Sequence, residues 1–212
     1  MRSPVWLAPM AGEAACAPLV AAVCEAGGLG WLGGAYLAPQ RLSRVIDEIR
    51  TRTARPFGVN LFCPQAWQRD AEREAAFLQV LAPLHAELGL PAPALPERFE
   101  EDFEAQLAVV QAQRVGAVGF TFGDPGAARI QALQAGGAVV VGTATQLAEA
   151  LQLQASGCDA VIAQGAEAGA HRGSFLGARD DGLVGTLALL PQLVDALRLP
   201  VIAAGGIADG RG

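Results

Sequence analysis

One histidine stands in a glycine-rich segment directly after an apolar run, and histidine is the side chain best suited to move a proton near neutral pH. The segment reads VIAQGAEAGAHRG over residues 161–173, and the apolar run Ala160–Gln164 at its start is predicted to be a strand. Residues just past the carboxyl ends of barrel strands face the active site. We therefore predict that His171 is a catalytic base, while a loop histidine with a structural hydrogen bond explains its position equally well. The other histidine, His85, lies in a helical pattern where a surface or packing role is expected.

A second candidate site follows the last apolar run. The stretch VIAAGGIADG, residues 201–210, places Gly205 and Gly206 directly after a predicted strand. Backbone N–H groups at such a turn hold phosphate groups in many α/β barrels. A phosphate site is therefore predicted there, and a tight turn without a ligand is the structural alternative.

Two further residues end or interrupt predicted strands. Met10 lies in the segment APMAG at the end of the first apolar run, and Asn60 lies inside the apolar run GVNLF. A buried asparagine needs hydrogen-bond partners, which either the backbone or a ligand can supply. Spacing alone leaves both interpretations of Asn60 open.

Other chemistry-bearing patterns are weak. Residues 28–33, GLGWLG, match the dinucleotide-binding pattern GxGxxG, but they follow a predicted helix and themselves form a strand, whereas the true pattern opens a helix. No serine or cysteine stands in a recognisable nucleophile turn. Two histidines without clustered carboxylates predict no metal site.

The elements that must position these residues alternate regularly. Short apolar runs, each followed by a helical pattern, predict seven strands: Val5–Ala8, Gly28–Leu32, Phe57–Phe62, Ala117–Phe122, Ala138–Gly142, Ala160–Gln164 and Pro200–Ala204. Such alternation indicates parallel strands joined by helical crossovers. We predict an α/β fold, a TIM (β/α)8-type barrel that is truncated after strand seven.

The domain organisation predicted from this pattern is a single domain over residues 1–212, incomplete at the carboxyl terminus. The long interval at about 63–116 is predicted to be a helical insertion that covers the barrel mouth, with helices at Gln65–Gly89 and Phe99–Val115. The sequence ends at Gly212, before an eighth strand, so a truncated, non-catalytic fragment remains an alternative from a different functional class.

Composition excludes several classes of partner. Hydrophobic residues make up 52% of the 212 residues, charged residues make up 17%, and the net charge is −6. Arginines are scattered along the chain without a basic patch, which argues against nucleic-acid binding. The apolar runs are too short or too interrupted for a membrane span. Four cysteines without a CxxC pair, and the lack of a secretory signal pattern, predict a reduced, cytoplasmic protein.

Taken together, the motifs resemble those of the nitronate monooxygenases, formerly called 2-nitropropane dioxygenases, in order and approximate spacing. They are APMAG, GGLGWLGG, FGVNLF, AQGAEAGAHRG and VIAAGGIADG. The resemblance covers essentially the whole chain, and the AQGAEAGAHRG stretch is its most specific part. One departure is Ala170, where the family usually has glycine.

The resemblance implies an FMN-dependent TIM barrel. By similarity, the residues that contact FMN would be Met10, Asn60, Gln164, Gly169, Gly205 and Gly206. His171 would lie beside the isoalloxazine as the base. The implied reaction converts an alkyl nitronate of the propionate 3-nitronate type, or its nitroalkane, with O2 to a carbonyl product and nitrite.

Alternatives on the same barrel are an FMN-dependent enoyl-ACP reductase and an NAD(P)H:quinone reductase. The arginine after His171 favours the monooxygenase. We also consider a homodimer as an assembly state of the protein.

Overall fold

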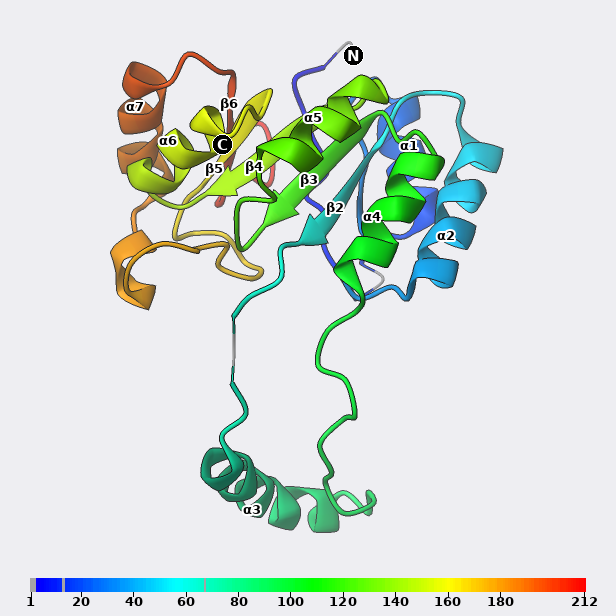
Figure 1. Cartoon of the computed structure of the whole chain (residues 1–212), viewed down its shortest axis with the longest axis vertical. Coiled ribbons are helices and arrows are strands. Elements are labelled where there is room, and N and C mark those ends of the chain that lie inside the picture. Colours follow the sequence, from blue (N-terminus) through cyan, green and yellow to red (C-terminus); the bar gives the residue numbers. More distant parts are fainter. Residues whose placement is uncertain (1–2, 13, 67) are drawn as a thin grey trace. The chain divides into compact units, whose positions relative to one another are not determined.

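The computed structural model describes residues 3–12, 14–66 and 68–212 (Figure 1). Its strands are β1 (Trp31–Gly33), β2 (Gly58–Phe62), β3 (Ala117–Thr121), β4 (Val139–Ala144), β5 (Ala160–Gln164) and β6 (Val201–Ala204). Its helices are α1 (Ala17–Glu25), α2 (Pro39–Arg52), α3 (Ala71–Glu87), α4 (Phe103–Ala112), α5 (Ala127–Ala135), α6 (Leu147–Ala155) and α7 (Thr186–Ala196). All six strands are parallel and stand in chain order. This arrangement confirms the predicted α/β fold of incomplete TIM-barrel type.

The chain divides into two compact units. One consists of residues 65–100 and contains α3, and the other contains the sheet and the remaining helices. The separate unit is shorter than the insertion taken from the sequence, because α4 belongs to the sheet unit. Phe103, Leu107 and Val110 of α4 are buried, and this helix packs on α2 and β2. Burial of this apolar face, which the sequence interval did not reveal, places α4 there.

The prediction of a first strand at Val5–Ala8 is wrong, because no extended strand forms there. The segment forms only an isolated bridge between Trp6 and Leu29, with backbone hydrogen bonds from Leu7 N–H to the Leu29 carbonyl and from Leu29 N–H to the Val5 carbonyl. The chain then turns, since Met10 N–H donates to the Ala8 carbonyl. The apolar run is present, but the turn ends the ladder after one bridge.

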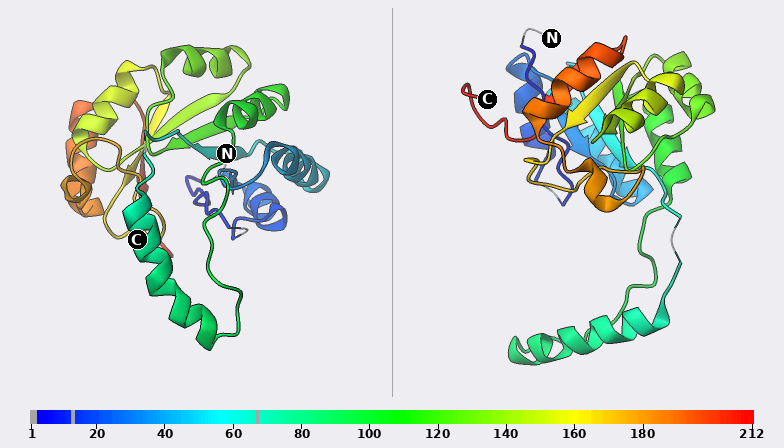
Figure 2. Two further views of the ribbon diagram at one scale, coloured as in Figure 1. Left: turned by 60° about the horizontal axis from the view of Figure 1, so that its bottom comes forward. Right: turned by 90° about the vertical axis from the view of Figure 1, so that its left-hand side faces the viewer.

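The helices of the sheet unit cover one face of the sheet, around which they form an arc (Figure 2). Outward-facing strand residues such as Val59, Val118 and Val140 are fully buried against helical side chains such as Ile46 and Leu153. This layer is the larger hydrophobic core. Because successive strand residues alternate between faces, the residues between these valines point to the inner face of the sheet.

The inner face is apolar at the amino ends of the strands. Trp31 is 1% exposed and packs with Ala117, Val141 and Ala160. A Cβ at Gly58 would lie only 2.3 Å from the Trp31 ring. Glycine at position 58 is therefore what allows this indole to fill the space between the strands.

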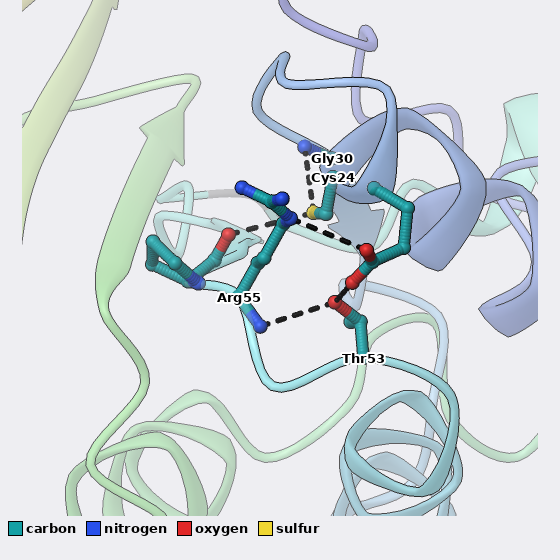
Figure 3. Close-up of polar contacts among 6 residues, drawn as sticks. Cys24, Gly30, Thr53 and Arg55 are labelled. Carbon is teal, nitrogen blue, oxygen red and sulfur yellow. Dashed lines mark hydrogen bonds and ion pairs between the residues drawn. The ribbon is translucent and has the colours of Figure 1, made fainter. Parts of the chain in front are cut away.

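Polar contacts hold the amino-terminal edge of the sheet together (Figure 3). Gly30 N–H donates to the Cys24 sulfur at 3.2 Å, and Thr53 and Arg55 both donate to the Glu25 carboxylate. The Thr53 hydroxyl and then Arg55 lower the pKa of Glu25, while burial raises the pKa of the Cys24 thiol. Features at this end of a barrel serve stability, so functional side chains are expected at the opposite edge.

Candidate functional site

His171 is surrounded by aromatic side chains that come from the carboxyl ends of three other strands. Its ring centroid lies 5.5 Å from that of Phe62 at the end of β2 and 5.8 Å from that of Phe122 just after β3. Tyr36, which follows β1, lies with its ring centroid 6.0 Å away and its hydroxyl oxygen 2.9 Å from His171 Nε2. The fold thus brings a loop after β5 to the ends of β1, β2 and β3.

Phe122 has a φ of 67°, in the left-handed region that a bulky residue rarely adopts. Such strain persists only where the surrounding structure holds it, and it clusters at functional sites. Phe122 also packs edge-on against Phe62, with 4.8 Å between centroids. Phe122, whose ring is part of the aromatic surroundings of His171, therefore has a strained backbone.

Gln164 holds the two ends of the His171 loop together. Its side-chain Nε2 donates to the His171 carbonyl at 2.9 Å, and its Oε1 accepts from Gly173 N–H at 2.7 Å. Gly173 in turn lies across the strand ends, because a Cβ there would approach the methyl groups of Thr121 at 3.0 Å and Thr143 at 3.2 Å. The loop therefore folds back over β3 and β4 and carries His171 with it.

Asn60 is 2% exposed, and the structure pairs it with a side chain on the neighbouring strand. Its amide nitrogen lies 3.2 Å and its amide oxygen 3.3 Å from the Thr121 hydroxyl, which can donate or accept. Gly119 beside it provides the room, since a Cβ there would lie 2.7 Å from Asn60 Oδ1. One hydroxyl cannot satisfy an amide that has two N–H donors and a carbonyl. Asn60 therefore retains hydrogen-bonding capacity on the inner face.

Arg172 supplies a partly buried positive charge next to His171 in the chain. Its Nη1 donates to the Gln164 carbonyl at 2.9 Å, whereas its Nε and Nη2 are buried without a hydrogen-bond partner among the described residues. Burial lowers the pKa of Arg172, and the nearby carboxylates of Glu149 and Glu167 oppose that shift. Buried N–H donors without protein partners are rare in native structures, and such donors suit a bound anion or a water.

The turn after β6 is built around a carboxylate at a helix amino terminus. Glu167 Oε2 accepts from the backbone N–H of Thr186, the first residue of α7, at 2.8 Å. The Thr186 hydroxyl lies 2.9 Å from both Glu167 Oε2 and the Gly205 carbonyl. Gly205 and Gly206 have φ values of 108° and 75°, which favour glycine. These contacts join the His171 loop to the predicted phosphate turn.

Glu167 should make stability depend on pH. The hydrogen bond from Thr186 N–H, more than the charge of Arg172, lowers the pKa of Glu167. A carboxyl whose pKa is lowered by folding contributes stability above the ordinary value of about 4.3, and that stability is lost as the pH falls. We expect the free energy of unfolding to fall less steeply from pH 7 into the acid range in Glu167→Gln than in the parent protein. Urea titrations at successive pH values measure this.

Asp195→Asn is the matched control for this prediction, since Asp195 is an exposed carboxylate near the other end of α7. It should leave the acid dependence as in the parent. If the free energy of unfolding falls equally steeply with decreasing pH in Glu167→Gln and in the parent protein, the Glu167 carboxylate does not have this stabilising role.

Glu149 is fully buried and organises the segment after His171. Its Oε2 accepts from Thr145 N–H and from the Thr145 hydroxyl, at 2.7 and 2.9 Å. Its Oε1 accepts from the backbone N–H groups of Phe175 and Leu176, at 2.6 and 3.0 Å. One carboxylate in the first turn of α6 therefore anchors both β4 and the His171 loop.

The structure connects some of the site residues predicted from the sequence and leaves others apart. His171 and Gln164 lie in one connected loop, and Asn60 lies on the same inner face, where Thr121 and Gly173 link it to that loop. Met10 lies with its backbone against Gly33, since a Cβ at Gly33 would come within 2.7 Å of the Met10 carbonyl. Gly169 lies in an open bend, with no atom near its would-be side chain.

The sequence interpretation missed Tyr36, Arg172, Glu149 and Glu167 as parts of this site. A usable signal existed for Tyr36, which is the only tyrosine in the chain and closely follows a predicted strand. Glu167 and Arg172 both stand in the AQGAEAGAHRG motif, but the motif does not show what their side chains contact. No comparable signal marked Glu149, because only folding reveals what its carboxylate contacts.

Metal-binding clusters and membrane-spanning helices are both absent from the described residues. Residues 3–12, 14–66 and 68–212 contain no group of three or more histidine, cysteine or acidic side chains arranged to bind a metal ion. In the same part of the chain, no helix combines the length and apolar character needed to cross a membrane.

Comparisons with known proteins agree with the motif pattern. Residues 2–212 match the sequence model described as nitronate monooxygenase. The chain is 44% identical to a protein of Pseudomonas aeruginosa named nitronate monooxygenase, covering 100% of this chain and 61% of that protein. It is 40% identical to a probable nitronate monooxygenase of Staphylococcus haemolyticus, covering 100% and 60%. The chain thus spans about three fifths of the length of these relatives.

Solved structures show the same relationship. A nitroalkane oxidase from Streptomyces ansochromogenes superposes with a TM-score of 0.90 at 40% identity, covering 96% of this chain and 58% of that one. FabK from Thermotoga maritima superposes less well, with a TM-score of 0.73 at 31% identity and coverage of 99% and 53%. From the family match over residues 2–212 and these similarities, the chain belongs to the nitronate monooxygenase family.

Proposed function

We propose that this protein oxidises alkyl nitronates, of the propionate 3-nitronate type, with O2 to a carbonyl product and nitrite, using FMN. The observation that carries the proposal is the His171 loop, which folds back over the carboxyl ends of the strands beside the buried amide of Asn60. The names of the related proteins, nitronate monooxygenase and nitroalkane oxidase, support the same substrate class.

The residues at this edge fit a flavin mononucleotide. Asn60 has unused hydrogen-bonding capacity on the inner face, and Arg172 has two buried N–H donors without partners among the described residues. Gly205 and Gly206 form a turn at positive φ, a conformation whose backbone N–H groups suit a phosphate. Amide groups, a cation and a glycine turn together match the polar ring edge and the anionic tail of FMN. We assign Met10, Gln164 and Gly169 to the same site as further cofactor contacts.

In the proposed reaction, the bound flavin supplies the electron acceptor. His171 takes the α-proton from a neutral nitroalkane, and in its protonated form the ring steadies the negative nitro oxygens of a nitronate. The Phe62 and Phe122 rings, which pack edge-on against His171, exclude water from one side of the imidazole. Gln164 keeps the loop in place through the backbone of His171, so positioning of the loop and proton transfer use different groups.

The test is a visible spectrum of the purified protein with added FMN, followed by anaerobic addition of propionate 3-nitronate. Flavin that elutes with the protein and is bleached by the nitronate supports the proposal. Nitrite should then appear in step with O2 consumption once air is admitted.

NADH with an enoyl thioester serves as the opposing substrate pair in the same assay. Flavin bleached by NADH but unaffected by the nitronate would assign the protein to the reductase alternative. Protein without bound flavin at saturating FMN would contradict the assignment of the cofactor site.

A further inference from the structure

Tyr36 is held in place next to His171 from two directions. Gln106 of α4 is 2% exposed, and its side-chain N–H group points at the carbonyls of Gly34, Ala35 and Leu37, at 3.1, 3.1 and 2.8 Å. These carbonyls flank Tyr36 on both sides. A buried amide that contacts three carbonyls of this loop fixes the backbone from which the tyrosine projects.

The Tyr36 ring is fixed as well. It packs edge-on against Phe62 with 5.7 Å between centroids, and its hydroxyl lies 2.9 Å from His171 Nε2. The histidine ring packs edge-on against both aromatic rings, with interplanar angles of 71° and 72°. Position and ring plane are therefore set for both members of the Tyr36–His171 pair, and only the location of the shared proton remains to be decided.

We propose that Tyr36 is a positioning residue that accepts a hydrogen bond from the Nε2–H of His171, so that the Nδ1 lone pair is the base. The role as a base rests on the proposed function, but the position of the proton does not. A neutral imidazole carries one N–H and one bare nitrogen, and the partner of one nitrogen determines the state of the other. Fixing the tautomer in this way is how an acceptor beside a catalytic histidine acts in hydrolase triads.

The surroundings favour this direction. Tyr36 is 55% exposed, so its hydroxyl can accept from His171 and still donate its own proton to water. Nδ1 has no hydrogen-bond partner within residues 3–12, 14–66 and 68–212, and the His171 side chain is exposed. The opposite direction, with the tyrosine donating to Nε2, would leave a proton on Nδ1 and occupy the only lone pair. It would provide no free base.

The chain is well suited to a spectroscopic test, because it contains two histidines and one tyrosine. Nitrogen-15 spectra of the flavin-loaded, histidine-labelled protein at about pH 8.5, well above the ordinary histidine value of about 6.5, distinguish protonated from bare ring nitrogens. His85→Gln assigns the two sets of signals. His85 is also an internal reference, since its Nδ1 lies 2.7 Å from the Pro91 carbonyl and must donate.

In the parent protein, we expect a proton on Nε2 of His171 and a bare Nδ1. In Tyr36→Phe, we expect His171 to become a mixture of the two tautomers, while the signals of His85 stay unchanged. A proton on Nδ1 in the parent protein overturns the proposal, and so does a His171 spectrum that Tyr36→Phe leaves unaltered. The parent spectrum alone decides the direction, whatever the yield of the variant.

Kinetics give an independent readout. Tyr36→Phe should lower kcat for a neutral nitroalkane about tenfold, because one hydrogen bond that fixes the base is lost, with kcat for the preformed nitronate changed less than about twofold. An equal loss with both substrates would indicate a structural role and overturn the proposal. If the parent protein turns over neither substrate, the proposed function fails, while the nitrogen spectrum still decides the tautomer.

Discussion

His171→Asn should retain FMN and lose turnover of a neutral nitroalkane by at least about a hundredfold, the low end of what a positioned base contributes. The physical reason is that the loop is held by groups other than the imidazole. Gln164 contacts the His171 carbonyl and Gly173 N–H, and Arg172 contacts the Gln164 carbonyl. The substitution therefore removes the proton acceptor without removing these contacts.

Flavin absorbance after gel filtration and steady-state nitrite release measure the two halves of this prediction. His85→Asn is the matched control, because His85 lies on α3 in the separate unit and should leave both readings unchanged. Full turnover in His171→Asn would eliminate this residue as the base. Loss of flavin as well as turnover would instead show that the imidazole supports the cofactor site.

Glu149→Gln should destabilise the protein by about 2–4 kcal/mol, a large effect for an isosteric change. Both carboxylate oxygens of Glu149 accept two hydrogen bonds each, and the side chain is fully buried. A glutamine presents an NH2 group, which cannot accept. If this group faces the loop, the N–H groups of Phe175 and Leu176 lose their acceptor, and if it faces β4, Thr145 N–H does.

Urea unfolding gives the free energy directly, and Glu48→Gln on α2 is the control. Glu48 forms an exposed pair with Arg52 at 3.1 Å, so its substitution should cost less than about 1 kcal/mol. If Glu149→Gln unfolds at the same urea concentration as the parent, the buried carboxylate does not anchor the loop. A lower affinity for FMN in the folded variant would extend its effect from stability to the site.

The sequence by itself determined the fold class. Apolar runs alternating with helical patterns specify parallel strands, because a strand covered on its outer face by helices and on its inner face by other strands must be apolar on both sides. Pro18 and Pro39 mark the starts of α1 and α2, and Gly136 follows α5, as their local backbone chemistry predicts. The position of His171 after a strand likewise follows from local pattern.

The first strand and the bounds of the insertion were not predictable in the same way. Val5–Ala8 has the composition of a strand, but its pairing ends where the chain turns at Ala8–Met10. α4 is recognisable as a helix, but only its packing on α2 and β2 assigns it to the sheet unit. Local propensity specifies an element, whereas contacts distant in sequence decide its length and place.

Only the tertiary structure decided which polar groups meet at the site. The contact between Tyr36 and His171 joins residues 135 positions apart, and the contact of Asn60 with Thr121 joins residues 61 positions apart. The roles of Glu149 and Glu167 depend on backbone N–H groups that become available only at the folded loop and at the start of α7. A pattern in sequence records residue types and spacing, while hydrogen bonds depend on distances between atoms that only the folded chain defines.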